Sequence, residues 1–408
     1  MWKAGFVLAW LALWSSLCAA ATARDPGTAA ESKLQSPSQS QPDAGPEAQL
    51  NRILEDIDRN RLGAALEKAD QLIQRYPNFR LGHLIKGDLL LARSRPLTTF
   101  GNAANAPPEQ LADLREEAIA RLKAYRDRSS AARYVPRYLL QMRADQKYAI
   151  VVDTEKARLY LYRNDDGQPR FVADYYTTHG KQGSEKIRQG DRKTPVGVYH
   201  VTSRIPADAL DKFYGDGAFP LNYPSEWDKR QGRDGSGIWL HGTPPDTYSR
   251  PPRASDGCII LANADLVAVA RNLQLGLTPV IISNSIEWLS YEDWQSERIA
   301  LNQKIEEWRT DWETRDYERF FKHYAKDFKA GGQTMKHFAQ LKNRNAGKEQ
   351  IKVVLSNLSV FRNPGKEQMV AVTFDQDFRS NSVSSQTKKS QYWIREDGTW
   401  KIIYEGHA

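Results

Sequence analysis

The sequence predicts a multidomain α+β protein with an N-terminal helical hairpin region, a central mostly-β domain and a C-terminal α+β cone. Three observations predict this organisation. Apolar residues recur at helical spacing before residue 146, alternation with a period of two begins at Lys147, and helix-like segments followed by alternating strands occupy the chain after residue 290. Because 408 residues are enough for several cores of ordinary size, we expect domains at 47–146, 147–284 and 290–408.

The first 23 residues have the features of a secretory signal peptide. Met1 to Lys3 give a positive start, residues 4–14 are apolar, and Ala21-Thr22-Ala23 is a small-x-small cleavage site. The apolar run is shorter than the ~20 residues that a spanning helix needs, which argues against a retained membrane anchor. Lipidation at Cys18 is disfavoured because the residue before it is large. We therefore expect an exported protein.

Residues 24–46 are rich in Pro, Ser, Gln and Ala, and they predict a flexible linker. The helical region follows, and one face of its clearest helix carries Leu62, Ala65, Leu66, Ala69, Leu72, Ile73 and Tyr76. Pro77-Asn78 interrupts this pattern before Leu81 to Arg93 resume it, which resembles one tetratricopeptide-like helical hairpin. An array needs about three repeats, so we expect a small helical domain, with a peptide-binding groove as the alternative.

Short runs rich in β-branched and aromatic residues predict the strands of the central domain, because Gly, Pro, Asn and Asp separate them. These runs are 148–152, 157–162, 171–177, 196–201, 238–240 and 280–282. One helix is expected at 263–273, where Asn263 can act as the N-cap.

The third unit begins with helix-like segments at 292–315 and 317–324 and continues with alternating strands. The strands are expected at 369–378, 391–395 and 400–404, with a hairpin turn at Glu396-Asp397-Gly398. This order, and the pattern W-x3-W…D-x3-FF-x2-Y-A-x-DF, resemble the nuclear transport factor 2-like fold. We expect its aromatic residues to form a core and the unit to be a scaffold or a dimerisation surface. A catalytic role is the alternative.

Composition and motifs exclude several classes of function. The formal net charge of +8 suits an anionic partner, but there is no RNA-binding signature, zinc-finger spacing or clustered basic helix, so we expect no nucleic acid. The seven histidines show no H-x3-H spacing and the cysteines no C-x2-C spacing, so no metal is expected. No phosphate-binding or dinucleotide fingerprint occurs, and we expect no cofactor.

Cys258 is the only cysteine left once the expected signal peptide is removed, so no intramolecular disulfide is expected. A free thiol has a pKa of about 8.5 and needs a base to become nucleophilic. His241 ends an apolar run and is the candidate base, provided that its strand lies beside the one that Cys258 begins. The Gly242 carbonyl can orient the other imidazole nitrogen, and the turn Ser255-Asp256-Gly257 can aim backbone N–H groups at an oxyanion. The alternative is a buried structural cysteine.

These residues match a known pattern. The series His241-Gly242…Ser255-Asp256-Gly257-Cys258 resembles the H-x(14–17)-[ST]-H-G-C signature of the L,D-transpeptidase (YkuD) catalytic domain. Gly190 to Tyr199 resembles the T-P-x-G-x-Y strand entry of the same domain. The resemblance implies that Cys258, assisted by His241 and Gly242, attacks the L,D peptide bond of a peptidoglycan tetrapeptide stem. D-Ala leaves, and a thioacyl enzyme remains.

Two positions depart from the family pattern. Asp256 stands where the family has histidine, and Ile260 stands where it often has arginine. A carboxylate beside the thiol opposes its ionisation unless Arg253 or another cation offsets the charge. Arg253 is also the candidate for binding a stem carboxylate, with a solvated loop arginine as the alternative.

The order of domains also resembles that of the cell-shape L,D-carboxypeptidases. We expect an L,D-transpeptidase that forms 3-3 cross-links or attaches an amine acceptor. The alternatives are an L,D-carboxypeptidase that trims tetrapeptide to tripeptide, another wall-peptide cleavage, and a non-catalytic peptidoglycan-binding protein. The expected partners are peptidoglycan stem peptides, with a homodimer through the C-terminal domain left open, and the expected location is periplasmic or cell-wall associated.

Overall fold

The structure is a computed structural model that describes residues 45–97, 99–103, 105–126, 129–330, 333–334 and 350–407. The expected signal peptide and residues 24–44 of the expected linker lie outside the described residues. Within the described part of the chain, no helix combines the length and the apolar character that crossing a membrane requires.

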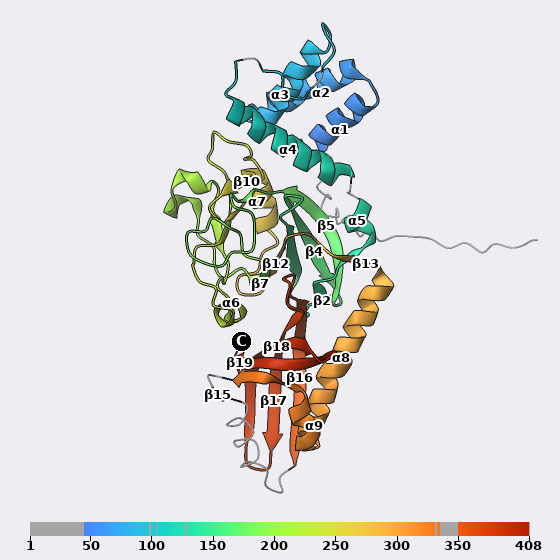
Figure 1. Cartoon of the computed structure of the whole chain (residues 1–408), viewed down its shortest axis with the longest axis vertical. Helices are drawn as coiled ribbons and strands as arrows, with labels where there is room; N and C mark the ends of the chain where they lie inside the picture. Colours follow the sequence, from blue (N-terminus) through green and yellow to red (C-terminus); the bar gives the residue numbers. More distant parts are fainter. Residues whose placement is uncertain are drawn as a thin grey trace, which may run out of the picture. The chain divides into compact units, whose positions relative to one another are not determined.

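Helices form the N-terminal region of the described chain (Figure 1). They are α1 Pro46–Asp58, α2 Leu62–Arg75, α3 Arg80–Leu91, α4 Pro108–Arg126 and α5 Ser129–Arg133. The expected hairpin corresponds to α2 and α3. Their apolar faces pack with Leu50 and Ile53 of α1, and Leu114 and Ala118 of α4 cover the same core. The region is therefore a small helical domain with its own core.

The central domain is built on a five-stranded sheet with the strand order β5-β4-β3-β12-β7. The strands are β3 Tyr148–Asp153, β4 Arg158–Asp165, β5 Gln168–Tyr176, β7 Gly197–His200 and β12 Pro279–Ser283. Alternate residues of β3 enter two different cores, Ile150 and Val152 on one face and Ala149 and Val151 on the other. Burial on both faces explains the continuous apolar run of this strand.

Short strands on one side of this sheet carry the residues that the sequence analysis singled out. A three-stranded sheet has the order β11-β9-β8, and β6 pairs with β10. Their bounds are β6 His179–Gly180, β8 Ala218–Pro220, β9 Trp239–His241, β10 Arg253–Ser255 and β11 Ile259–Ile260. Two helices, α6 Glu226–Arg230 and α7 Asn263–Ala270, complete the domain. The N-cap of α7 is Ala262, so the expectation that Asn263 caps this helix is wrong.

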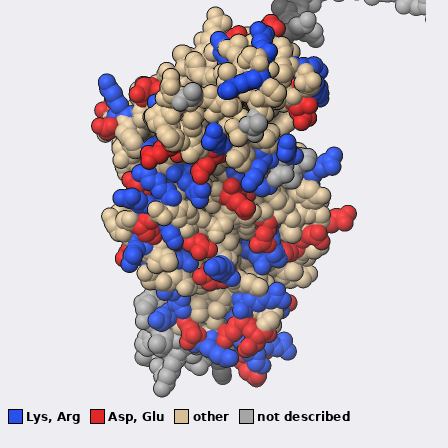
Figure 2. Space-filling model, turned by 45° about the horizontal axis from the view of Figure 1, so that its top comes forward, with Lys and Arg blue, Asp and Glu red and all other residues tan. Residues whose placement is uncertain are grey.

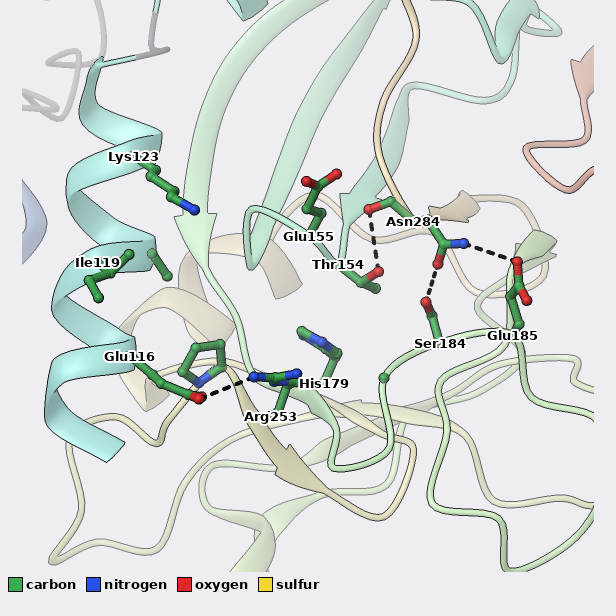
Figure 3. Close-up of a pocket in the computed structure, with 13 residues that line it drawn as sticks. Glu116, Ile119, Lys123, Thr154, Glu155, His179, Ser184, Glu185, Arg253 and Asn284 are labelled. Atoms are coloured by element: carbon green, nitrogen blue, oxygen red, sulfur yellow. Dashed lines mark hydrogen bonds and ion pairs between the residues drawn. The ribbon is translucent and has the colours of Figure 1, made fainter. Parts of the chain in front are cut away.

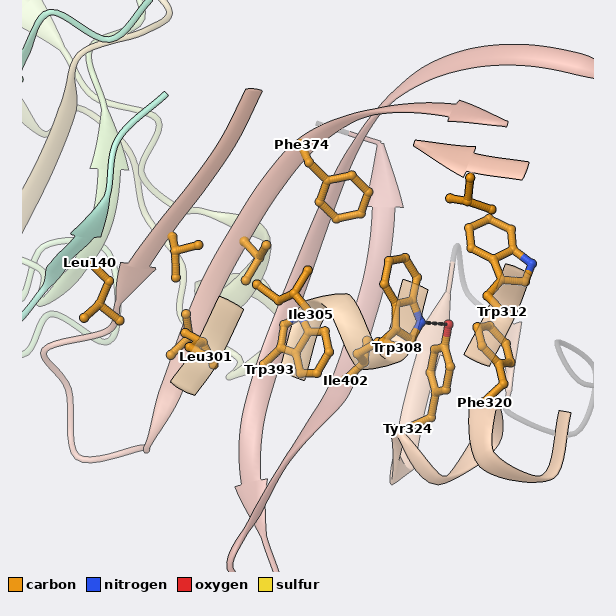
Figure 4. Close-up of a cluster of buried hydrophobic side chains, with 14 of the residues drawn as sticks. Leu140, Leu301, Ile305, Trp308, Trp312, Phe320, Tyr324, Phe374, Trp393 and Ile402 are labelled. Carbon is orange, nitrogen blue, oxygen red and sulfur yellow. Dashed lines mark hydrogen bonds between the residues drawn. The ribbon is translucent and has the colours of Figure 1, made fainter. Parts of the chain in front are cut away.

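The C-terminal domain packs two helices against a curved, mostly antiparallel sheet, in which β14 runs parallel to β19 (Figure 1). The helices are α8 Tyr291–Glu313 and α9 Tyr317–Lys322, and the strands are β14 Tyr324–Ala330, β15 Gln333–Thr334, β16 Ile351–Arg362, β17 Met369–Ser380, β18 Ser384–Glu396 and β19 Thr399–His407. Figure 4 shows the aromatic core between them, where Trp308 donates from Nε1 to the Tyr324 hydroxyl at 3.0 Å. The aromatic residues of this unit thus form a core, as expected.

The segment before the central domain differs from the sequence prediction. Helical spacing was expected to about Arg143, but the last helix of this region ends at Arg133, and β1 Val135–Pro136 and β2 Leu139–Gln141 follow. Strand β1 pairs with β13 Trp288–Leu289, and β2 forms the edge of the C-terminal sheet beside β16. Both segments become strands because they pair with strands that are distant in the sequence. The spacing of apolar residues within a short segment cannot reveal such a partner.

A buried ion network joins the helical domain to the central domain. Arg158 of β4 donates to Glu47 of α1 at 2.8 Å, and Arg121 of α4 binds both Glu47 and Glu117. Removal of one partner would leave a buried charge uncompensated, which costs several kcal/mol, typically about 3–5 kcal/mol. The network therefore holds α4 in a defined position against the central domain.

Charges of both signs are interspersed over the face in Figure 2. That face therefore shows no large patch of a single sign.

Candidate active site

His241 ends strand β9, and Cys258 directly precedes the neighbouring parallel strand β11. Residue Ile259 of β11 pairs with Leu240 of β9, and Ile260 pairs with His241. The side chains of Ile259 and Leu240 both enter the core of the central domain. Because side chains alternate along a strand, His241 faces away from that core, and Cys258, one residue before β11, is expected on the same side.

The His241 ring is buried and held in one tautomer. Its Nδ1 lies 2.7 Å from the Gly242 carbonyl oxygen. A carbonyl can only accept, so Nδ1 carries the hydrogen and Nε2 carries the lone pair. Burial lowers the pKa of His241 to about 4, a hydrogen bond to Gly242 opposes this shift, and the charge of Arg250 adds to it. The imidazole is therefore neutral at neutral pH and can accept a proton at Nε2.

Asn263 fixes the backbone around His241. Its Oδ1 accepts from the N–H of Thr243 at 3.1 Å and of Asp216 at 3.2 Å, and its Nδ2 donates to the Thr243 carbonyl at 2.9 Å. A Cβ on Gly242 would lie 2.0 Å from Asn263 Oδ1. Only glycine allows this approach, so Asn263 is a positioning residue for the segment that orients the imidazole.

The Cys258 thiol is half-buried and protonated. Its Sγ donates to the Gly237 carbonyl at 3.2 Å. Burial raises the pKa of Cys258 to about 11, and the Asp256 carboxylate raises it further, while the Trp239 N–H and Lys186 lower it. The resting site therefore pairs a neutral thiol with a neutral imidazole. The hydrogen bond to the Gly237 carbonyl has to break before the thiol can give its proton to another group.

The turn before Cys258 is closed by the Ser255 hydroxyl. Ser255 Oγ donates to the Cys258 carbonyl at 2.6 Å and accepts from the Gly257 N–H at 3.1 Å. Gly257 has φ +131°, and a Cβ there would lie 2.8 Å from the Lys193 carbonyl oxygen. The Gly257 N–H is therefore occupied, in contrast to the expected series of free donors. Among the described residues the structure records no acceptor for the Cys258 N–H.

The second motif of the sequence analysis contacts this turn through Thr194. Thr194 Oγ1 donates to the Gly257 carbonyl at 2.9 Å and accepts from the Gly180 N–H at 2.9 Å. The Lys181 N–H donates to the Ser255 carbonyl at 2.7 Å. The segment from Gly190 to Tyr199 thus supports the backbone of the turn, a role that the spacing alone did not reveal.

The two charged residues that flank the turn have partners of their own. Asp256 is exposed and lies 3.3 Å from Lys181 Nζ and 3.9 Å from Arg192 Nε. Arg253 instead pairs with Glu116 of α4 at 3.1 Å. Lys181 and Arg192, not Arg253, offset the Asp256 carboxylate.

Arg250 is a candidate that the sequence analysis missed. Its guanidinium lies 5.2 Å from the ring centroid of Phe213, a ring that lies 6.1 Å from that of His241. Its Nη1 is buried and has no hydrogen-bond partner among the described residues. The Arg250 carbonyl accepts from Thr178 Oγ1 at 3.1 Å, and Thr178 pairs with Ile260. The sequence did offer one indication. Ile260 stands where the family often has arginine, so an arginine from elsewhere in the chain could have been sought.

Within the described parts of the chain, no group of three or more His, Cys, Asp or Glu side chains is arranged to hold a metal ion.

Comparisons with known proteins assign two domains. The profile of the L,D-transpeptidase catalytic domain matches residues 147–282, and that of the Cds6 C-terminal NTF2-like domain matches residues 300–406. A comparison with curated protein sequences finds no match.

Solved structures share both domains. Bd1075 from Bdellovibrio bacteriovorus is 30% identical with a TM-score of 0.61, and the alignment covers 67% of this chain and 98% of that one. Pgp2 from Campylobacter jejuni, described as a helical cell shape determining protein, is 25% identical with a TM-score of 0.55, covering 66% of this chain and 95% of that one. The multidomain α+β fold with an NTF2-like C-terminal domain is confirmed. The chain belongs to the L,D-transpeptidase (YkuD) family, in the architecture that carries a C-terminal NTF2-like domain.

Proposed function

We propose that this protein is a cysteine-dependent L,D-transpeptidase that acts on tetrapeptide stems of peptidoglycan, with Cys258 as nucleophile and His241 as general base. One observation carries the proposal. Cys258 directly precedes β11, the strand that pairs with β9 where His241 lies, and the Gly242 carbonyl holds the imidazole in the tautomer that accepts a proton at Nε2.

In the first half-reaction, Cys258 Sγ attacks the carbonyl carbon of the L,D peptide bond while its proton moves to His241 Nε2. The carbonyl oxygen becomes an oxyanion, and the Cys258 N–H is the donor available to stabilise it. The intermediate then collapses, His241 returns the proton to the leaving amine, and D-Ala departs. A thioester between the stem and Cys258 remains.

In the second half-reaction, an acceptor attacks the thioester and His241 takes the acceptor's proton. Cys258 leaves and recovers that proton as a thiol. An amine acceptor produces a 3-3 cross-link or an attached amine compound, whereas water produces a tripeptide stem. The two outcomes share Cys258 and His241 and differ only in what enters second.

Proton transfer accompanies the attack in this proposal. The pKa of Cys258 is raised to about 11 and that of His241 is lowered to about 4, so the thiolate–imidazolium pair is disfavoured in the empty site. His241 therefore acts as a general base during the attack, and no thiolate is present beforehand.

We assign recognition of the stem carboxylate to Arg250. Its Nη1 is buried without a partner among the described residues, close to His241, whereas Arg253 pairs with Glu116. An arginine fork suits a carboxylate. Arg250 would thereby compensate for Ile260, which stands where the family often has arginine, and Arg253 remains the alternative contact.

L,D-carboxypeptidase activity is the second candidate function. The observation that favours it is the architecture shared with Pgp2, a helical cell shape determining protein. Because peptidoglycan is the substrate in both cases, we place the protein in the periplasm or at the cell wall.

Incubation of the mature protein with purified tetrapeptide muropeptides, followed by mass analysis, tests the proposal. Cross-linked dimers with loss of D-Ala support transpeptidation, and tripeptide products support carboxypeptidation. Unchanged tetrapeptide that nevertheless binds the protein would contradict both enzymatic functions and leave the non-catalytic peptidoglycan-binding protein.

A further inference from the structure

A pocket lies between α4 and the central domain. It has a volume of about 640 Å³, within the range of small-molecule sites, and neither Cys258 nor His241 lines it. Figure 3 shows α4 as one wall, with Lys123 and Glu116 on it, and His179, Glu155 and Arg253 opposite. Helix α4 precedes both matched ranges, which are 147–282 and 300–406. The pocket therefore combines the family's catalytic domain with a wall that the family match does not include.

His179 supplies a buried polar atom without a partner. The residue is 5% exposed and lines the pocket. Its Nδ1 has no hydrogen-bond partner among the described residues. A buried polar nitrogen that lacks a partner costs about 1–3 kcal/mol. A ligand with an amide or another polar group in the pocket would remove that cost.

Two opposite charges on the pocket walls are also unpaired. Lys123 of α4 and Glu155, in the turn between β3 and β4, are exposed and line the pocket. The described residues make no ion pair with either, whereas the neighbouring Glu116 and Arg253 pair with each other at 3.1 Å. Lys123, Glu155 and His179 Nδ1 thus offer a cation, an anion and a neutral hydrogen-bonding atom that have no partner within the described parts of the chain.

We propose that this pocket binds a zwitterionic amino-acid head group, in which an ammonium and a carboxylate share one carbon. Lys123 receives the carboxylate, Glu155 receives the ammonium, and His179 Nδ1 hydrogen-bonds a neighbouring amide. This inference rests on the proposed function for its context, because a peptidoglycan stem that contains a diamino acid presents such a head group.

The pocket is within reach of a stem held at Cys258. Arg253 precedes Cys258 by five positions, so their Cα atoms are at most about 18 Å apart, and an extended tetrapeptide spans about 14 Å. Strand β10 connects the two sites directly, because Arg253 lines the pocket and Ser255 supports the Cys258 turn. A stem can therefore place its head group in the pocket while another part of it, or a second stem, lies at Cys258.

The test measures binding to the full mature chain carrying Cys258→Ala, which prevents turnover. Calorimetric titration at low salt uses two probes, free meso-diaminopimelate and a disaccharide tetrapeptide containing the same residue. Binding of both probes points to the free amino acid as a sufficient ligand, and binding of the muropeptide alone points to the stem as the source. Absence of binding for both overturns the proposal.

Charge variants identify the pocket as the place of binding. Lys123→Met and Glu155→Gln should each weaken binding about tenfold to a hundredfold, since each removes a charge-assisted contact. Amidation of the probe's carboxylates should weaken binding to the parent and leave binding to the Lys123→Met variant nearly unchanged. Lys329→Met removes the same charge from an exposed position on β14 and should bind as the parent does. Equal affinity in the parent, Lys123→Met and Glu155→Gln would overturn the proposal.

A second readout separates this inference from the proposed function. D-Ala release is measured in the same preparations with Cys258 intact. If wild type releases D-Ala and the Lys123 and Glu155 variants bind as the parent does, the pocket assignment fails and the enzymatic proposal stands. If wild type releases no D-Ala and the charge variants still lose binding, the enzymatic proposal fails and the pocket assignment stands.

Discussion

The Cys258 site and the pocket beside α4 each contain a buried neutral histidine, but the two differ in what holds the ring. Burial lowers the pKa of His241 and of His179 to about 4 in both regions. His241 Nδ1 is fixed by the Gly242 carbonyl, whereas His179 Nδ1 has no partner among the described residues. A lowered pKa therefore does not distinguish a general base from a residue that contacts a ligand. We expect the distinction to lie in the hydrogen bond that fixes the tautomer, which His241 has.

Replacement of the proposed nucleophile should cause the largest loss of activity, and it tests the Cys258 site alone. Cys258→Ala should abolish D-Ala release, because the described residues contain no other free thiol. Circular dichroism should show an unchanged fold, since the side chain is small and half-buried. Muropeptide mass analysis provides the measurement, and continued release of D-Ala would overturn the assignment of Cys258.

Replacement of the two histidines separates their roles. His241→Asn should slow acylation by about 10²- to 10⁴-fold, the usual effect of losing a general base. His179→Asn removes a contact that we place in binding, so it should raise KM while the single-turnover acylation rate at saturating substrate stays near that of wild type. Single-turnover rates measure acylation directly. If both variants slow acylation equally, the hydrogen bond that fixes the His241 tautomer does not mark the difference between the two histidines.

The difference between the regions also shows what the sequence could reveal. Cys258, His241 and the turn between them lie within a short stretch that has a recognisable pattern, and the fold class followed from the change in hydrophobic period. Arg250, Asn263 and Thr194 act through contacts that only the fold creates. The same holds for Lys123 and Glu155, which come from different domains, and for β2, whose partner β16 is distant in the sequence.

Arg250 tests whether carboxylate recognition belongs to the Cys258 site. Arg250→Met should raise KM and lower kcat/KM by about tenfold to a hundredfold, the value of a charge-assisted contact. Arg253→Met should have a smaller effect, because Arg253 is half-exposed and pairs with Glu116. Steady-state kinetics on tetrapeptide and on a substrate with an amidated terminal carboxylate measure the contact. If Arg250→Met lowers kcat/KM for the amidated substrate as much as for the tetrapeptide, the guanidinium does not bind the terminal carboxylate.

The pH dependence should follow His241 on the acid side. The group acts in its neutral form, so activity should be full above its pKa of about 4 and fall about tenfold for each unit below it. The free energy of unfolding should also fall as the pH falls. The unfolded chain binds a proton at this histidine at a higher pH than the folded protein does, so acid favours the unfolded state. A rate–pH profile with a parallel circular dichroism titration separates the two effects. An acid limb near pH 6.5 in a folded protein would show that substrate or solvent restores the ordinary pKa.

The smallest expected effect concerns Asp256, the residue that departs from the family pattern inside the turn. Its carboxylate raises the pKa of Cys258, but burial of the thiol is the larger cause, and Lys181 and Arg192 already offset the charge. Asp256→Asn keeps the size of the side chain and removes the charge, so the pH at which iodoacetamide alkylates Cys258 half-maximally should fall slightly. Lys181→Met should move it in the opposite direction, because it leaves the Asp256 carboxylate with only the more distant Arg192. If neither variant moves the alkylation profile, Asp256 has no electrostatic influence on the sulfur, and its contribution is confined to the turn.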